Sequence, residues 1–229
     1  MPRDVGVILV AAGRGERLGG VPKQYRPIAG VPMVLRALRP FVAHPEVLHT
    51  VIALPPADAA SPPAFLADLA GPTLTLVAGG AERGDSVAAG LAALVAECGI
   101  VLVHDAARPF PEPDVIGAVI REARSGHGAV AAVPVTDTVK EVSDGDPRRI
   151  VRTLSRDALW RAQTPQGFPR ELLAAAHARA RRDATGATDD AGLVERLGAE
   201  VRVVPDSPRN LKVTTAEDLE WAELWAARR

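Results

Sequence analysis

The chain opens with a short apolar segment that runs directly into a glycine-rich loop: Val5–Val10 (VGVILV) is followed by residues 11–20 (AAGRGERLGG) and 22–25 (PKQY). A continuous apolar run bounded by glycine is typical of a strand buried on both faces of a parallel sheet. The small residues after it allow backbone N–H groups to approach a ligand closely, because no Cβ stands in the way. Such N–H groups suit a polyphosphate when cations lie nearby, as Arg17 and Lys23 do here. A tight turn with solvated charges explains this stretch alone almost as well.

The loop matches neither of two common phosphate-binding patterns. The Walker pattern needs a lysine directly after its last glycine, and no lysine follows glycine in that way here. The dinucleotide pattern Gly-x-Gly-x-x-Gly fits at Gly13 and Gly15, but its third position is Leu18. The next predicted strand also ends in residues 53–56 (ALPP), without the acid that would hold a ribose. The loop resembles a third type, Gly-x-Gly-x-Arg-Leu with a downstream Pro-Lys, which the sugar nucleotidyltransferase-like fold carries.

Composition narrows the class of protein. Of the 229 residues, 47% are hydrophobic and 3% aromatic, so we expect a single α/β domain over residues 1–229 with a core of Ala, Val, Leu and Ile. A formal net charge of −1 argues against nucleic acid or an anionic membrane as the main partner. The single cysteine, Cys98, cannot form an internal disulfide, which fits a reducing compartment. With no signal peptide and no apolar run long enough to span a bilayer, we expect a cytoplasmic protein.

Apolar runs and helical patterns alternate along most of the chain. After the first strand, the patterns predict strands at 49–54, 74–77, 100–104, 128–133 and 200–204, and helices at 33–42, 63–69, 87–97, 113–124, 170–182, 191–197 and 216–227. This alternation is typical of a doubly wound, mostly parallel α/β sheet with right-handed crossovers. Ligands in such sheets bind at the carboxyl ends of the strands, and the glycine- and aspartate-containing motifs fall there.

A β-hairpin interrupts this alternation. Residues 136–142 and 149–154 alternate polar and apolar side chains, and residues 143–147 (SDGDP) between them are a strong turn signal. No helix of its own covers this hairpin, so its apolar positions need a partner. We expect an arm at about residues 136–155 that packs on another subunit of a homodimer. A flap over the chain's own site is the alternative.

Asp105 is the best candidate for a metal ligand. It follows His104 and the apolar residues 100–103, which places it at the end of a central strand. A lone carboxylate there suits Mg²⁺, which takes one or two protein carboxylates and completes its shell with phosphate and water. A capping aspartate is the structural alternative, and we interpret the neighbouring His104 as a packed or hydrogen-bonded residue. Cations gather in the loops, as phosphoryl or nucleotidyl transfer requires: Arg14, Arg17, Lys23, Arg83, Arg108, Arg156, Arg209 and Lys212.

The ordered set of motifs closely resembles the 2-C-methyl-D-erythritol 4-phosphate cytidylyltransferase family. The resemblance covers nearly the whole chain; any one segment is a weak signal, whereas the ordered set is a strong one. The segments are 11–18 (AAGRGERL), 22–25 (PKQY), 79–87 (GGAERGDSV), 103–109 (VHDAARP), 159–166 (LWRAQTPQ), 188–190 (TDD) and 210–214 (NLKVT). It implies a Rossmann-like nucleotidyltransferase fold with an inserted β-arm.

The resemblance implies that CTP is one substrate and that Mg²⁺, or another divalent cation, is the cofactor. Small residues would line the CTP site through their backbone or read the cytosine edge: Ala11, Ala12, Gly13, Gly80 and Ser86. Arg17 and Lys23 would hold the triphosphate and stabilise charge at its α-phosphorus. Family members often carry an acid where this chain has Ala81, so one polar contact to the nucleotide is missing here.

The second substrate implied is methylerythritol phosphate. Asp105 would bind the metal near it, Arg108 and Thr188 would contact it, and Lys212 would position its phosphate. A phosphate oxygen would then attack the α-phosphorus of CTP directly and pyrophosphate would leave. The product would be 4-diphosphocytidyl-2-C-methyl-D-erythritol, an intermediate of the non-mevalonate isoprenoid pathway.

The resemblance also assigns a role to the arm. Thr138 and Arg156 would reach from it into the neighbouring subunit's site. The expected catalytic residues are therefore Arg17, Lys23, Arg156 and Lys212.

Three rival functions stay open. A cytidylyltransferase for another polyol phosphate, such as ribitol 5-phosphate, would share the CTP site and differ around Arg108, Arg156 and Thr188. An NAD-type oxidoreductase conflicts with Leu18 and with the missing acid after the second strand. A non-catalytic nucleotide-binding or assembly protein would not need Asp105 together with three cationic loops.

Overall fold

Seven strands form one sheet in the order β11-β7-β10-β6-β1-β4-β5. The computed structural model describes residues 2–13 and 22–228. The strands are β1 (Val5–Val10), β4 (Val47–Leu54), β5 (Leu74–Ala78), β6 (Ile100–Asp105), β7 (Gly128–Pro134), β10 (Trp160–Pro169) and β11 (Val201–Pro205). All neighbours pair in parallel except β10, which runs antiparallel to both β6 and β7. The prediction of a mostly parallel sheet is confirmed.

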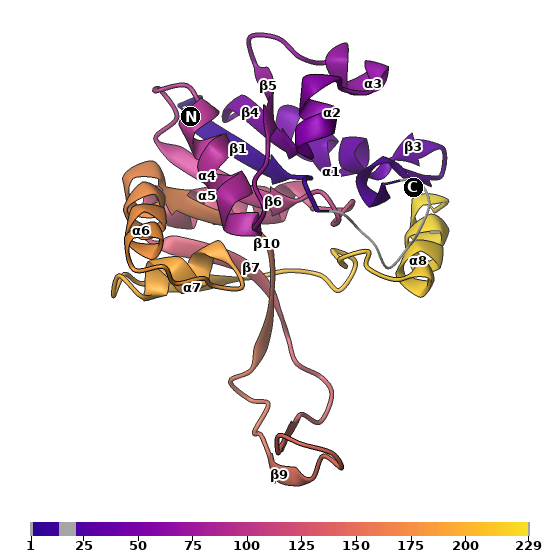
Figure 1. Ribbon diagram of the computed structural model, residues 1–229, viewed down its shortest axis with the longest axis vertical. Coiled ribbons are helices and arrows are strands. Elements are labelled where there is room, and N and C mark those ends of the chain that lie inside the picture. The colour runs from indigo at the N-terminus through magenta and orange to yellow at the C-terminus, as the bar shows by residue number, and fades with distance from the viewer. Residues whose placement is uncertain (1, 14–21, 229) are drawn as a thin grey trace.

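Helices cover both faces of this sheet (Figure 1). On one face lie α4 (Arg83–Ala93), α6 (Arg170–Arg182) and α7 (Asp190–Glu195), and on the other lie α1 (Met33–Val42) and α5 (Pro113–Arg124). Alternation along β1 serves both layers: Ile8 packs with the first set, while Val7 and Leu9 pack with the second. The winding is therefore double, as predicted. Among the described residues, no helix is long and apolar enough to cross a bilayer.

Small elements connect and flank the sheet. They are η2 (Lys23–Tyr25), β2 (Pro27–Ile28), β3 (Val31–Pro32), α2 (Pro56–Ala60), α3 (Ala64–Ala67) and α8 (Ala216–Ala226). The helix predicted over 63–69 is reduced to the single turn of α3. The helix predicted over 87–97 begins earlier, at Arg83, because Glu82 and Asp85 form a reciprocal capping box there.

Strand β10 was not predicted from the sequence. Its middle carries Gln163, Thr164 and Gln166, all buried, and the pairing with β7 is interrupted between Ala162 and Gln166. A polar run that contains proline does not show strand periodicity. These side chains are tolerated inside because each one hydrogen-bonds to a neighbouring loop, a partnership that hydropathy does not reveal.

The predicted hairpin is present as β8 (Lys140–Val142) and β9 (Ile150–Thr153), with shorter strands than expected. It continues from β7 and returns into β10, and Figure 1 shows it projecting away from the sheet and its helices. Ile150 and Val151 are 65% and 61% exposed, although both are apolar. In the single chain the arm therefore leaves apolar side chains in solvent and does not form a flap over its own site.

Candidate active site

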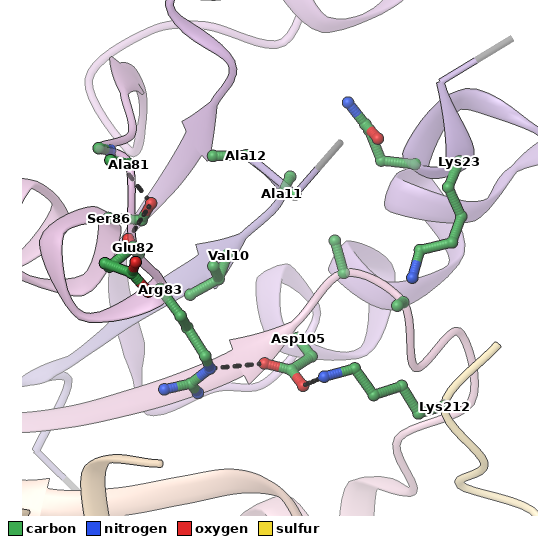
Figure 2. A pocket seen from close by; sticks show the side chains of 15 residues that line it. Val10, Ala11, Ala12, Lys23, Ala81, Glu82, Arg83, Ser86, Asp105 and Lys212 are labelled. Atoms are coloured by element: carbon green, nitrogen blue, oxygen red, sulfur yellow. Dashed lines mark hydrogen bonds and ion pairs between the residues drawn. The ribbon is translucent and has the colours of Figure 1, made fainter. Parts of the chain in front are cut away.

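Residues far apart in the sequence line one cavity of about 200 Å³ at the carboxyl ends of β1 and β6 and the start of α4 (Figure 2). This is the edge of the sheet where α/β proteins bind ligands. Eight of the site residues expected from the sequence meet here: Ala11, Ala12, Gly13, Lys23, Gly80, Ser86, Asp105 and Lys212. Arg17 lies outside the described residues.

Two glycines allow the loop after β5 to approach the loop after β1. A Cβ on Gly79 would lie 2.5 Å from the Cβ of Ala12 and 2.6 Å from Ser86 Oγ. A Cβ on Gly80 would lie 2.2 Å from the Cβ of Asp85. Ser86 is buried, and its Oγ accepts from the Gly80 amide at 3.2 Å. The wall formed here consists mainly of backbone and small side chains, and Glu82 adds one carboxylate beside them.

Asp105 lies between two cations on the opposite wall. Its Oδ1 is 3.1 Å from Arg83 Nε and its Oδ2 is 2.7 Å from Lys212 Nζ (Figure 2). Burial alone would raise the pKa of this carboxyl, but the charges of Arg83, Lys212 and Arg108 outweigh burial and hold the pKa far below its usual range. Asp105 is therefore ionised at any physiological pH.

Arg83 is the site residue that sequence reasoning placed wrongly. The sequence suggests a loop cation available for phosphate, but the guanidinium is shared between two carboxylates: besides Asp105, its Nη1 lies 2.6 Å from Asp190 Oδ2. Asp190 is buried and accepts a second contact from His177 Nε2 at 2.9 Å. Arg83 thus fixes Asp105 in place. Its partners come from a strand end and from α7, so only the fold reveals them.

Lys23 reaches the cavity from η2, a single turn that two neighbours hold in place. Gln24 is buried, and the Tyr25 hydroxyl donates to Asp58 Oδ2 at 2.7 Å. The Tyr25 ring also packs edge-on against Phe65. Lys23 is consequently presented on an anchored turn, and its nitrogen points toward the cavity in Figure 2.

Four expected site residues do not line the cavity in the single chain. Arg108 is half-buried behind Asp105, where its Nη1 donates to the backbone oxygen of Asn210 at 2.7 Å and burial lowers its pKa. Thr188 is exposed beside a separate surface depression near Gly186. Thr138 and Arg156 are exposed in the arm, and Arg156 donates to the backbone oxygen of Thr136.

The donor set at Asp105 suits a cation that brings most of its own ligands. Among the described residues, no three His, Cys, Asp or Glu side chains gather to form a metal site. A divalent cation here would depend on Asp105 and on phosphate oxygens, which is the usual arrangement for Mg²⁺. The Lys212 side chain that now contacts Asp105 Oδ2 is 43% exposed, so it has room to move aside.

We predict that Arg83→Gln destabilises the protein in a pH-dependent way. Removing the guanidinium leaves Asp190 buried without its main cation, which costs about 3–5 kcal/mol of unfolding free energy near pH 7. Burial opposes the charged form of Asp190, whereas the hydrogen bond from His177 and the charge of Arg83 lower its pKa, so loss of Arg83 raises that pKa in the folded variant. The difference in stability from wild type should therefore shrink as the pH falls and the carboxyl takes up its proton.

Urea unfolding of wild type and variant at several pH values measures this difference. Arg202→Gln is the matched control, because Arg202 also contacts two carboxylates but lies at the surface. The control should cost little at any pH. An Arg83→Gln loss that is constant with pH would contradict the assignment of Asp190 as the charge that Arg83 holds.

Comparison with known proteins agrees with this geometry. The family model for 2-C-methyl-D-erythritol 4-phosphate cytidylyltransferase matches residues 5–228. The protein of that name from Salinibacter ruber is 44% identical over 221 residues, which cover 96% of this chain and 92% of the relative. The one from Streptomyces coelicolor is 44% identical over 237 residues, which cover 100% of this chain and 87% of the relative.

Solved structures point the same way. The 2-C-methyl-D-erythritol 4-phosphate cytidylyltransferase of Thermus thermophilus superposes with a TM-score of 0.79 at 35% identity, covering 96% of this chain and 98% of the other. The 4-diphosphocytidyl-2C-methyl-D-erythritol synthase of Anaerococcus prevotii gives 0.84 at 26% identity, covering 98% of each chain. The chain therefore belongs to the 2-C-methyl-D-erythritol 4-phosphate cytidylyltransferase family.

Proposed function

We propose that this protein joins CTP and 2-C-methyl-D-erythritol 4-phosphate to give 4-diphosphocytidyl-2-C-methyl-D-erythritol and pyrophosphate, a reaction of isoprenoid biosynthesis. The observation that carries the proposal is the convergence of Lys23, Asp105 and Lys212 on one cavity, opposite a wall made mainly of backbone and small side chains. A nucleotidyltransferase needs both surfaces, because a base and a polyphosphate must bind side by side.

The wall of backbone and small side chains is suited to the nucleotide base. The Gly80 amide donates to the Ser86 hydroxyl, which donates to the backbone oxygen of Glu82. Either group can give up this partner for the edge of a pyrimidine. The backbone of Ala11, Ala12 and Gly13 follows the same wall. Ala81 presents only a methyl group there, so we assign recognition of the base to the backbone and to Ser86.

The cationic side is suited to the phosphates. Transfer needs no protein nucleophile, because the acceptor phosphate is already an anion; its barrier lies in bringing two anions together. Lys23 and Lys212 supply mobile point charges for the triphosphate and for the acceptor phosphate, and Arg17, assigned from the family pattern, adds a third. The same cations also stabilise the negative charge that develops at the α-phosphorus in the transition state.

We assign the divalent cation, Mg²⁺, to Asp105. Its carboxylate is ionised and directed into the cavity, which suits a metal that takes one protein carboxylate and completes its shell with phosphate oxygens and water. When bound, the cation neutralises phosphate charge and polarises the phosphoryl oxygens. Arg83 keeps the carboxylate ionised and oriented whether or not the cation is present.

The acceptor side extends beyond the single chain. Thr138 and Arg156 belong to an arm that projects away from the cavity and exposes apolar side chains (Figure 1). We propose that the protein is a homodimer in which each arm packs on the partner, and that these two residues complete the partner's acceptor site next to Arg108 and Thr188.

The rival functions fit the molecule less well. The family that the chain belongs to does not favour ribitol 5-phosphate as the acceptor, nor an NAD-type oxidoreductase. The formal net charge of −1 supports small anionic substrates, with neither nucleic acid nor membrane as a partner. Cys98 is a buried free thiol, which is compatible with work in the cytoplasm.

A pyrophosphate-release assay tests the function. CTP, ATP, UTP and GTP are each combined with methylerythritol phosphate or ribitol phosphate, with and without Mg²⁺. We expect release only with CTP, methylerythritol phosphate and the metal.

Lys23→Ala should lower kcat by a factor on the order of 10² or more and leave the fold intact, because a cation at the transferring phosphate is lost. Arg182→Ala, an exposed cation on α6, is the control and should keep full activity. Near-normal turnover by Lys23→Ala would contradict its assigned role.

Mixed dimers test the proposed role of the arm. Lys23→Ala and Arg156→Ala each inactivate the enzyme if Arg156 serves the partner's site. In a dimer of one chain of each kind, one site then carries both defects and the other carries none. Mixed dimers isolated through two affinity tags should regain about half of the wild-type activity, because one of their two sites is intact. Activity of the mixture no higher than that of the two parents would show that each chain completes its own site.

A further inference from the structure

His104 and Thr164 form a buried pair directly behind the cavity. His104 has no exposed surface and Thr164 is 4% exposed. Thr164 Oγ1 lies 3.0 Å from His104 Nδ1, and His104 Nε2 lies 2.9 Å from the backbone oxygen of Arg108. The backbone nitrogen of Asp105 donates to the same Thr164 Oγ1 at 3.1 Å. The pair therefore connects the two ends of the segment from Asp105 to Arg108.

The chemistry of these groups fixes the direction of each hydrogen bond. A backbone carbonyl can only accept, so His104 Nε2 carries the proton directed at Arg108. With one ring proton on Nε2, Nδ1 is left as the acceptor that faces Thr164 Oγ1. The Thr164 hydroxyl then donates its only proton to Nδ1, and its lone pairs accept from the Asp105 N–H. Every donor in this buried series of hydrogen bonds has one acceptor.

The same strand residue also holds the loop that carries Lys212. The backbone oxygen of Thr164 accepts from Asn210 Nδ2 at 2.7 Å, and Asn210 is fully buried two residues before Lys212. The backbone oxygen of Asn210 in turn accepts from Arg108 Nη1 at 2.7 Å. Thr164 thus hydrogen-bonds to two segments of the site: the segment from His104 to Arg108, which carries Asp105, and the loop that carries Lys212. Thr164 does not line the cavity itself.

We propose that Thr164 and His104 are positioning residues for the acceptor phosphate. Their hydrogen bonds run in series from the Asp105 N–H through Thr164 and His104 to the carbonyl of Arg108. This series holds Asp105 and Arg108 in the positions that bind this substrate. The inference rests on the proposed function, since it concerns the acceptor side of that site. The CTP side is held by different contacts, those of Gly80 and Ser86.

Thr164→Val tests the proposal because it keeps the shape of the side chain and removes the hydroxyl. The Asp105 N–H and His104 Nδ1 are then buried without partners, and the segment must shift to satisfy them. We expect the KM for the acceptor to rise roughly tenfold or more, with the KM for CTP changed less than about twofold. Thr164→Ser retains the hydroxyl and should restore the acceptor KM.

Thr75→Val is a matched control. Thr75 Oγ1 also pairs with a histidine, His49 Nε2, at 3.0 Å, but that pair lies on β4 and β5 and does not line the cavity. The control should lose stability by thermal unfolding and keep both KM values. An unchanged acceptor KM in Thr164→Val, or an equal rise in Thr75→Val, would overturn the proposal. If wild type itself failed to use the acceptor, the proposed function would fall instead.

A second measurement needs no substrate and no activity. Two-bond ¹H–¹⁵N correlation spectra of the full chain distinguish the tautomers of its histidine rings, and loss of a signal in His104→Asn identifies His104. At pH 7 the ring proton should be on Nε2, with Nδ1 unprotonated. A proton on Nδ1 would show that the hydrogen bonds do not run in the proposed direction.

Discussion

The ionised carboxylate of Asp105 is the constraint that the rest of the site depends on. A buried charge costs several kcal/mol unless it is paired, and a site that binds phosphates would otherwise avoid an anion. Asp105 is retained between Arg83 and Lys212, two cations of different character. Arg83 is fixed by a second contact, whereas Lys212 is partly exposed. A carboxylate held by one immobile and one mobile cation can exchange the mobile one for a metal without losing its orientation.

The pairing of Asp105 also depends on residues much later in the chain. Arg83 needs Asp190 as well as Asp105, and Asp190 in turn is supported by His177. Asp190 opens α7, whose N-cap Asp189 accepts from Gly192 and from Gln166 on β10. The short helix α7 therefore exists as much to present a carboxylate as to cover the sheet. The TDD motif at residues 188–190 is explained in this way: Asp190 holds Arg83, which contacts Asp105, and Asp189 caps the helix that presents Asp190.

Features set by local sequence patterns could be predicted, whereas features set by contacts between residues far apart in the sequence could not. The strands β1, β4 and β6 are continuous apolar runs, and their carboxyl ends had to meet at one edge, so the cavity and eight of its residues could be anticipated. Strand β10 could not, because its buried glutamines and threonine are stabilised by residues distant in sequence: the end of β6 at 104–105, the start of α7 at 189–191, and Asn210. Arg83 was misassigned for the same reason: its two acids are 22 and 107 residues away. Hydropathy has no access to such partners.

The arm at about residues 136–155 also has too few contacts of its own to explain its stability. A two-stranded hairpin is at best marginally stable in water, and this one exposes Ile150, Val151 and Val142. Its register is held mainly by polar cross-strand contacts, such as Lys140 with Thr153 and Arg152 with Glu141. Surface pairs of this kind contribute little. Burial of the apolar positions against a partner would supply the missing stabilisation and would carry Thr138 and Arg156 with it. In such a dimer the acceptor site forms only when the arm is docked, so assembly and catalysis would depend on one surface.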